Sequence, residues 1–271
     1  MYVSKNEKQK WDDAALNYQD VFKLGINEYN ARLLRFWQEK GMLFPGCRVI
    51  DIGCGVGKYG TYLASLGCDV TLTDISQEMI RHAKENMAKF STPWTALCCD
   101  FNDITGEEEA FARGFDLAIS TMSPAIHDRE TVRKMSSITR GWCFIARFYD
   151  WEQPLRDELM TAAGLTPKSR FERSLKLDCE DMLNAVRDAG FTPDIEYVDY
   201  NWADERSAGE MAEYMYRNYF MDDASGEDLK NRIHGIITEK YGAEGFVNDC
   251  VNTRVAWIYW KTEERYDKRA V

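Results

Sequence analysis

The stretch that decides the fold is V-I-D-I-G-C-G-V-G-K-Y-G, residues 49–60, where an apolar run around Asp51 leads into a glycine-rich turn. Gly55, Gly57 and Gly60 have the spacing G-x-G-x-x-G, which lets the backbone approach a nucleotide-like ligand closely. This spacing alone is a weak signal because several classes of nucleotide-binding protein share it. The surrounding sequence therefore has to identify the ligand.

Strand-like and helix-like segments alternate on both sides of this turn. Helices are expected within 11–40, at 58–66, at 76–90 and up to residue 140. Strands are expected at 47–52, 69–73, 95–99, 115–120, 142–148, 194–200 and 252–260. This alternation predicts an α/β fold with a doubly wound, mostly parallel, seven-stranded sheet.

Composition favours a small-molecule ligand over a nucleic acid. The chain has 271 residues, and its 34 basic and 45 acidic side chains give a formal charge of −11, with no basic stripe for phosphates. Its eight cysteines are scattered without a C-x-x-C pair, so we expect no metal site. Because no apolar run reaches about 18 residues and no signal peptide is evident, we expect a cytoplasmic protein without membrane contact.

Three aspartates narrow the identity of the ligand. Asp51 precedes the glycines, where a carboxylate suits a cationic amino group and repels a pyrophosphate. Asp74 ends the second strand, 21 residues after Gly53, where a carboxylate can bind ribose hydroxyls. Asp100 ends the third strand and is followed by Phe101, a pair suited to adenine. Proteins that bind NAD share the second feature but not usually the first and third together.

These features resemble the class I S-adenosylmethionine-dependent methyltransferases. The resemblance rests on V-I-D-I-G-C-G-V-G, T-L-T-D-I-S, C-C-D-F and F-D-L-A-I-S-T-M-S-P, and spans roughly residues 11–150. It implies a Rossmann-like fold and S-adenosylmethionine as cofactor. It further implies cofactor contacts for nine residues: Asp51, Gly53, Gly55, Gly57, Asp74, Ile75, Asp100, Phe101 and Ser120.

The family pattern assigns these residues to parts of the cofactor. Asp51, Gly53 and Ser120 are expected near the methionine moiety, and Gly55 and Gly57 allow close approach of the backbone. For the adenosyl part, the resemblance implies that Asp74 binds ribose, Ile75 and Phe101 flank adenine, and Asp100 meets the adenine amino group.

The resemblance also suggests a domain organisation. We expect a single methyltransferase domain over 1–271, with N-terminal helices in 1–44 and a cofactor-binding core in 45–150. Helical insertions in 151–190 and 203–250 are expected to form a substrate cover. A homodimer is compatible with this organisation.

The methyl acceptor is expected to be an O, N or S atom of a small molecule. Ser123-Pro124-Ala125 departs from the D/N-P-P-Y/F signature of enzymes that methylate base or glutamine nitrogens. His127 is one of three histidines, a residue type that often serves as a general base, although it can instead be a residue at the start of a helix capped by Asp128. Tyr18 is expected either to close over the sulfonium or to anchor its own helix.

A substrate pocket is expected around six residues: Met122, Arg147, Tyr149, Tyr214, Met215 and Asn218. The aromatic and methionine-rich helix over 211–221 can instead pack on the core, and Arg147 can form a surface ion pair. Two other functions stay open at this point: an NAD-dependent oxidoreductase and a non-catalytic S-adenosylmethionine-binding protein.

Overall fold

The computed structural model describes residues 5–23, 25–105, 111, 114–166, 174–220 and 226–263. The chain packs as two compact units. The first comprises Met1–Arg147, Cys179–Glu196 and Ala256–Val271, and the second comprises Phe148–Asp178 and Tyr197–Val255. Three boundaries between the units fall within strands, and the fourth falls within a helix.

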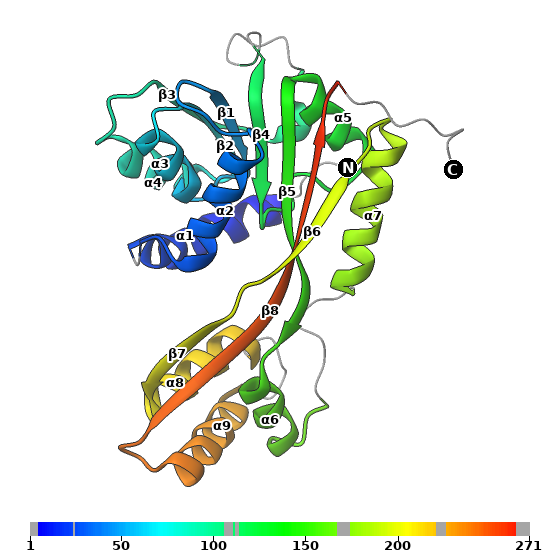
Figure 1. Cartoon of the computed structure of the whole chain (residues 1–271). Coiled ribbons are helices and arrows are strands. Elements are labelled where there is room, and N and C mark those ends of the chain that lie inside the picture. Colours follow the sequence, from blue (N-terminus) through cyan, green and yellow to red (C-terminus); the bar gives the residue numbers. More distant parts are fainter. Residues whose placement is uncertain are drawn as a thin grey trace. The chain divides into compact units, whose positions relative to one another are not determined.

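The central sheet has the predicted doubly wound topology. Its strands are β1 (Arg48–Ile52), β2 (Asp69–Asp74), β3 (Trp94–Cys98), β4 (Phe115–Thr121), β5 (Thr139–Glu152), β6 (Asp194–Asp199) and β8 (Phe246–Lys261). They lie in the order β3-β2-β1-β4-β5-β8-β6 (Figure 1). The pairs β1–β2, β2–β3, β1–β4 and β4–β5 are parallel. The order reverses between β1 and β4, where open α/β sheets bind their ligands.

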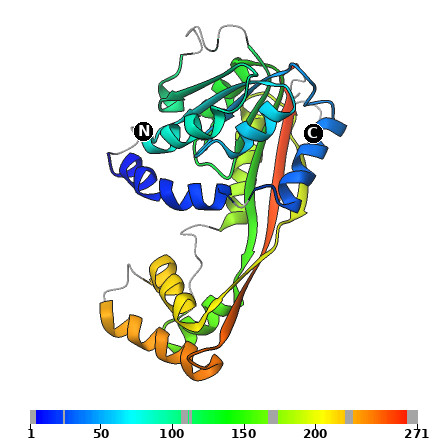
Figure 2. The ribbon, with the colours of Figure 1, turned by 90° about the vertical axis from the view of Figure 1, so that its left-hand side faces the viewer.

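Helices flank this sheet in the first unit. They are α1 (Lys5–Lys23), α2 (Glu28–Glu39), α3 (Lys58–Ser65), α4 (Gln77–Met87), α5 (Arg129–Ser137) and α7 (Leu175–Asp188), and a short turn, η1, spans Phe101–Asp103. Helices α3 and α4 pack against β2, and α1 packs below α4 (Figures 1 and 2). Local chemistry explains the helix starts: Ser76 and Asp128 each accept a hydrogen bond from a backbone N–H of the first turn.

The core of the first unit is apolar and aromatic. Val49, Ile50 and Ile52 of β1 have no exposed surface. Burial of each of these side chains stabilises the folded state by about 1.5–3 kcal/mol relative to leaving the side chain in water. Phe36 and Phe144 pack against Trp257 with ring centroids 4.8 and 6.0 Å away. The continuous apolar runs that predicted the strands are therefore buried on both faces of the sheet.

The second unit contains α6 (Pro154–Ala162), β7 (Trp202–Ser207), α8 (Ala208–Met215), a π-helical turn, η2 (Tyr216–Phe220), and α9 (Gly226–Tyr241). Strand β7 pairs antiparallel with β8 and gives the sheet an eighth strand. The sequence analysis did not predict this strand, which begins after the strand expected at 194–200 and overlaps the start of the segment 203–250 expected to be a helical insertion. Two of its half-buried positions carry the charged residues Asp204 and Arg206. The sequence therefore lacks the alternation of apolar and polar residues that marks a half-buried strand.

The helices of the second unit bury a core of their own. Its fully buried residues include Met211, Met215, Ile233, Ile237 and Val247. The substrate cover that the sequence predicted for these helices stays a prediction. Within the described ranges, no helix has both the length and the apolar character needed to cross a membrane.

Candidate functional site

The glycine turn follows β1 at the reversal point of the sheet. Gly53 and Gly55 have φ angles of +72° and +54°, in the left-handed region that glycine tolerates best. The N–H of Gly53 donates to the carbonyl of Thr73, at 2.8 Å, and so ties the turn to β2. A Cβ atom at Gly53 would lie 1.9 Å from Oγ of Ser123. Both the backbone conformation and the neighbouring loop therefore require glycine at position 53.

Asp74 holds the turn from the end of β2. Its Oδ2 accepts the N–H of Gly55 and its Oδ1 accepts the N–H of Ser76, each at 2.9 Å. Burial raises the pKa of Asp74, although these backbone hydrogen bonds oppose the shift. Each carboxylate oxygen keeps a second lone pair, so the predicted contact with ribose hydroxyls remains chemically open. Asp74 therefore shapes the turn, and its contact with a ligand stays a prediction.

Asp51 is a buried carboxylate beside the same turn. It is 1% exposed, and neither of its carboxylate oxygens has a hydrogen-bond partner among the described residues. Burial, with a further contribution from the charge of Asp74, raises its pKa to about 8. A buried carboxylate is unfavourable unless a cation or donors satisfy it. The α-ammonium group of a methionine moiety would supply both a positive charge and hydrogen-bond donors to Asp51. These residues therefore fit S-adenosylmethionine.

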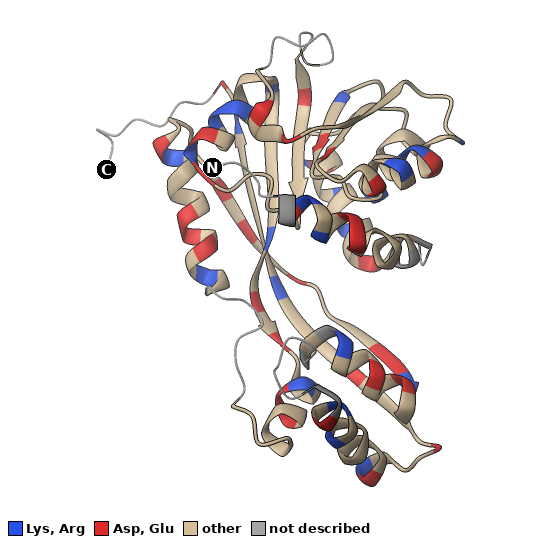
Figure 3. Ribbon diagram, turned by 180° about the vertical axis from the view of Figure 1, so that it is seen from behind, with Lys and Arg blue, Asp and Glu red and all other residues tan. Residues whose placement is uncertain are grey.

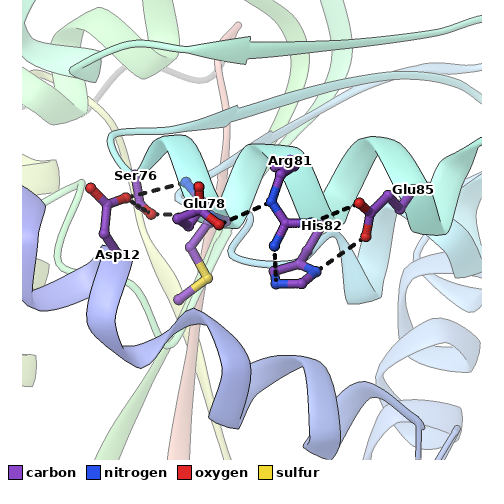
Figure 4. A network of polar contacts seen from close by, with 7 residues as sticks. Asp12, Ser76, Glu78, Arg81, His82 and Glu85 are labelled. Carbon is purple, nitrogen blue, oxygen red and sulfur yellow. Dashed lines mark hydrogen bonds and ion pairs between the residues drawn. The ribbon is translucent and has the colours of Figure 1, made fainter.

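Helix α1 is attached to the start of α4 by Asp12 (Figure 4). Oδ1 of Asp12 accepts the Ser76 hydroxyl at 2.5 Å and the N–H of Glu78 at 3.2 Å. Although burial opposes the shift, these hydrogen bonds lower the pKa of Asp12. Asp12 thus helps to cap α4 at Ser76, which lies 64 residues further along the chain and two positions after Asp74. Sequence reasoning missed Asp12 because its partner comes from a distant element.

Two further contacts fix α1 on the first unit. Gln19 and Asn86 exchange side-chain hydrogen bonds of 2.9 and 3.0 Å, and Asn86 also donates to the carbonyl of Val56 in the glycine turn. Tyr18 is 46% exposed and meets the ring of Trp11 edge-on at 6.2 Å. Its exposure argues against Tyr18 as the apolar anchor of the helix. Its predicted role at the sulfonium stays a prediction.

The residues expected around adenine follow β2 and β3. Ile75 is half-buried between Asp74 and the cap of α4. Oδ1 of Asp100 accepts two hydrogen bonds of 2.8 Å from Asn102, one from its backbone and one from its side chain. Phe101 is only 4% exposed and begins η1. Asp100 thus stabilises a local turn, and the adenine contacts of these residues stay predictions.

The loop after β4 lies against the glycine turn. Met122 has a φ of +53°, the one left-handed residue other than glycine in the described chain. Its N–H donates to the carbonyl of Ala146 at 2.9 Å, and the chain then turns so that Ser123 reaches Gly53. Backbone strain of this kind is held only where surrounding structure enforces it, and it often marks functional sites. The loop residue Met122, predicted to line a pocket, is therefore strained beside the glycine turn.

Arg147 and Asp128 hold the rest of this loop. The guanidinium of Arg147 donates to the carbonyl of Ile126. Asp128 is the N-cap of α5, accepts the N–H of Thr131 at 2.9 Å, and forms a capping box with it. The cap interpretation of Asp128 is confirmed. Arg147 orders the loop, which differs from the surface ion pair considered from the sequence.

His127 lies between these two anchors. Its backbone N–H donates to Oγ1 of Thr131 at 3.0 Å. Its side chain is 48% exposed, with Nε2 3.8 Å from Oδ2 of Asp128. The imidazole is thus accessible on a loop whose backbone is fixed, and its role as a base stays a prediction.

Two predicted site residues are fully buried. Ser120 has no exposed surface, and its hydroxyl donates to the carbonyl of Ile52 at 3.0 Å, joining β4 to β1. This bond favours a structural role over the expected contact with the methionyl group. Met215 has no exposed surface and lies in the core of the second unit. This burial favours the alternative that the helix packs on a core, and the assignment of Met215 to a substrate pocket stays a prediction.

The other predicted pocket residues are spread over the chain. Tyr149 packs against Tyr197 with ring centroids 4.5 Å apart. The Arg206 guanidinium lies 4.5 Å from the ring centre of Tyr214. The side chain of Asn218 lies outside the described residues.

Comparison with known proteins agrees with this site. Residues 49–141 match the family model described as a methyltransferase domain. Ribosomal RNA small subunit methyltransferase C of Alcanivorax borkumensis is 30% identical over 131 residues, which cover 48% of this chain and 37% of that protein. The ubiquinone biosynthesis O-methyltransferase of Paraburkholderia phymatum is 25% identical over 212 residues, covering 72% of this chain and 87% of that protein.

Solved structures share the fold at lower identity. Phosphoethanolamine N-methyltransferase 2 of Haemonchus contortus, solved with phosphomonomethylethanolamine and S-adenosylhomocysteine, is 18% identical. The match covers 96% of this chain and 60% of that one, with a TM-score of 0.53. The [4+2]-cyclase SpnF is 16% identical, with 92% and 94% coverage and a TM-score of 0.50. At these identities the likeness shows the fold alone.

Sheet order, the glycine turn and Asp51, whose carboxylate has no hydrogen-bond partner among the described residues, fit a Rossmann-like domain for an adenosyl amino acid. Residues 49–141 match a methyltransferase domain, and the relatives and the shared fold support a class I S-adenosylmethionine-dependent methyltransferase with S-adenosylmethionine as its cofactor. The nicotinamide alternative is thereby set aside.

Proposed function

We propose that the protein transfers the methyl group of S-adenosylmethionine to an O, N or S nucleophile of a small molecule. The observation that carries this proposal is Asp51, a buried carboxylate without a partner among the described residues, beside the glycine turn. A carboxylate at this place selects a ligand that presents a cation where dinucleotides present a pyrophosphate. The fold alone does not decide the reaction, since a cyclase shares it.

The chemistry divides between cofactor and chain. S-adenosylmethionine, when bound, supplies a methyl group on a sulfonium, which is already activated toward a nucleophile. Asp51 would hold the ammonium group, and Asp74 would hold the ribose hydroxyls while keeping Gly55 in place. The remaining task of the chain is to align the acceptor, which can contribute about 7–11 kcal/mol to lowering a barrier.

His127 is our proposed general base for acceptors that arrive protonated. Its exposed imidazole lies on the loop whose Ser123 reaches Gly53, and Arg147 and Asp128 fix the backbone of that loop. We expect His127→Gln to lower kcat at pH 7 by about 10²–10⁴-fold, the usual contribution of a general base, without changing affinity for S-adenosylhomocysteine. His234→Gln, an exposed histidine of α9, is the matched control. Unchanged turnover of His127→Gln at every pH would remove His127 from the reaction.

Charge distribution supports a small-molecule acceptor. Lys and Arg are interspersed with Asp and Glu along the helices (Figure 3), and the chain as a whole carries −11. The match to the ribosomal RNA methyltransferase spans 37% of that protein, whereas the match to the ubiquinone biosynthesis O-methyltransferase spans 87%. Both features favour a metabolite over a polyanion.

The proposal is tested by incubating the protein with methyl-labelled cofactor and either a metabolite extract or total RNA. We expect label in a product below about 1 kDa, which mass spectrometry can identify. Asp51→Asn should lose this label, while Asp69→Asn, at the opposite end of β2, should keep it. Label in the RNA alone would refute the small-molecule proposal, and cofactor binding without any labelled product would support a non-catalytic binding protein.

A further inference from the structure

A buried acid–amide pair lies within the second unit. Gln153, the N-cap residue of α6, and Asp249 of β8 are each 1% exposed. Nε2 of Gln153 donates to Oδ2 of Asp249 at 2.7 Å. The other oxygens of the pair, Oδ1 of Asp249 and Oε1 of Gln153, have no hydrogen-bond partner among the described residues. The pair therefore presents two unsatisfied buried acceptors.

Around this pair, two carboxylates, Asp204 and Asp249, share one guanidinium, that of Arg206. Strand register places Asp204 of β7 directly opposite Asp249, so two carboxylates share one face of the hairpin. Arg206 pairs with Asp204, at 2.6 and 2.9 Å. Burial raises the pKa of Asp249, the hydrogen bond from Gln153 opposes the shift, the charge of Asp204 adds to it, and the charge of Arg206 partly offsets it. A positive charge near Asp249 would relieve this unfavourable burial.

Aromatic rings border the same face. Trp202 lies two positions from Asp204 on β7, and therefore on the same face of the strand. Its ring meets Trp151, two residues before Gln153, edge-on at 5.2 Å. The guanidinium of Arg206, the partner of Asp204, lies 4.5 Å from the ring centre of Tyr214 on α8. Aromatic faces attract organic cations.

We propose that the second unit binds a small organic ammonium ion whose N–H groups donate to Oδ1 of Asp249 and Oε1 of Gln153. Two acceptors, an excess of negative charge and neighbouring aromatic rings select a primary or secondary amine. An anion would be repelled, and a neutral donor would leave the charge of Asp249 unbalanced. The site goes beyond the proposed function and does not rest on it, since all of its residues belong to the second unit.

A proton is the competing occupant. A protonated Asp249 could donate from Oδ1 to Oε1 of Gln153 and satisfy both acceptors without a ligand. The two occupants differ in a measurable way, because only the amine site responds to added amine.

The test is thermal unfolding and tryptophan fluorescence of the full chain at pH 7 with methylammonium chloride. Tetramethylammonium chloride, which lacks N–H donors, and sodium chloride at equal ionic strength are the comparisons. We expect a saturable rise in Tm and a fluorescence change with methylammonium, and at least tenfold weaker binding of tetramethylammonium. No saturable response to methylammonium would overturn the site and favour the shared proton.

Substitutions at the pair test whether the response to methylammonium arises there. Asp249→Asn, which keeps the shape and removes the charge, should abolish the methylammonium effect, and Gln153→Ala should weaken binding at least fivefold. Asp199→Asn is the matched control, because Asp199 is an exposed carboxylate of the same unit that pairs with Arg254 at 3.0 Å. If Asp249→Asn fails to fold, Gln153→Ala carries the test alone. Retention of full methylammonium affinity by either variant at the pair would overturn the proposal.

Discussion

Titration of Asp51 should control how tightly the protein binds its cofactor. Burial raises the pKa of this carboxyl group to about 8, so it holds a proton in the free protein at pH 6–7. A bound ammonium group needs the carboxylate, and binding must therefore release that proton. The affinity for S-adenosylhomocysteine, which carries the same ammonium group, should rise about tenfold per pH unit from 6 toward 8.

The same titration should lower the stability of the free protein as pH rises, whereas it raises the affinity for the cofactor. Because the pKa in the folded state lies above the ordinary value of 3.8, the folded protein binds this proton more tightly than the unfolded chain. Between these two pKa values the contribution of Asp51 to the free energy of unfolding should fall by about 1.4 kcal/mol per pH unit. Above pH 8 the contribution stays constant. Asp51→Asn should remove this slope and make the free protein more stable than wild type at pH 8.

Isothermal titration calorimetry measures both effects of Asp51→Asn on binding. Loss of a charge-assisted hydrogen bond of about 1.5–3 kcal/mol should weaken S-adenosylhomocysteine binding by about 10- to 100-fold at pH 8. Titrations at pH 6, 7 and 8 in two buffers of different ionisation enthalpy count released protons. Wild type and the control Asp69→Asn should release close to one proton at pH 6, and Asp51→Asn should release none. Equal proton release by wild type and Asp51→Asn would refute the reasoning.

Three further substitutions test the packing. Asp12→Ala should destabilise the protein by about 1–2 kcal/mol and speed proteolysis within α1. Asp13→Ala should do neither, because Asp13 accepts a hydrogen bond from Gln9 of the same helix. The left-handed backbone at Met122 should make Met122→Gly more stable than Met122→Val by about 1–3 kcal/mol in urea unfolding, and the reverse order would contradict the strain. Met215→Ala should cost about 2–5 kcal/mol and Met215→Leu under about 1.5 kcal/mol, and a small effect of alanine would place Met215 outside the core.

Local patterns were sufficient for the sheet and for the main features of the cofactor site. The apolar runs, the glycine turn and the positions of Asp51 and Asp74 depend on residues adjacent in the chain, and the strands and the turn appear where the sequence predicted them. The cap at Asp128 also follows from its immediate neighbours. Strand β7 was not predicted because its half-buried positions include Asp204 and Arg206, which pair with each other within the second unit.

The sequence by itself determined the fold class and the cofactor, because these follow from local periodicity, backbone freedom and charge. Only the tertiary structure decided which side chains become partners. Asp12 caps a helix 64 residues away, and Gln153 meets Asp249 across 96 residues. Such pairs form when packing brings distant elements within hydrogen-bond distance, and no local pattern specifies that distance.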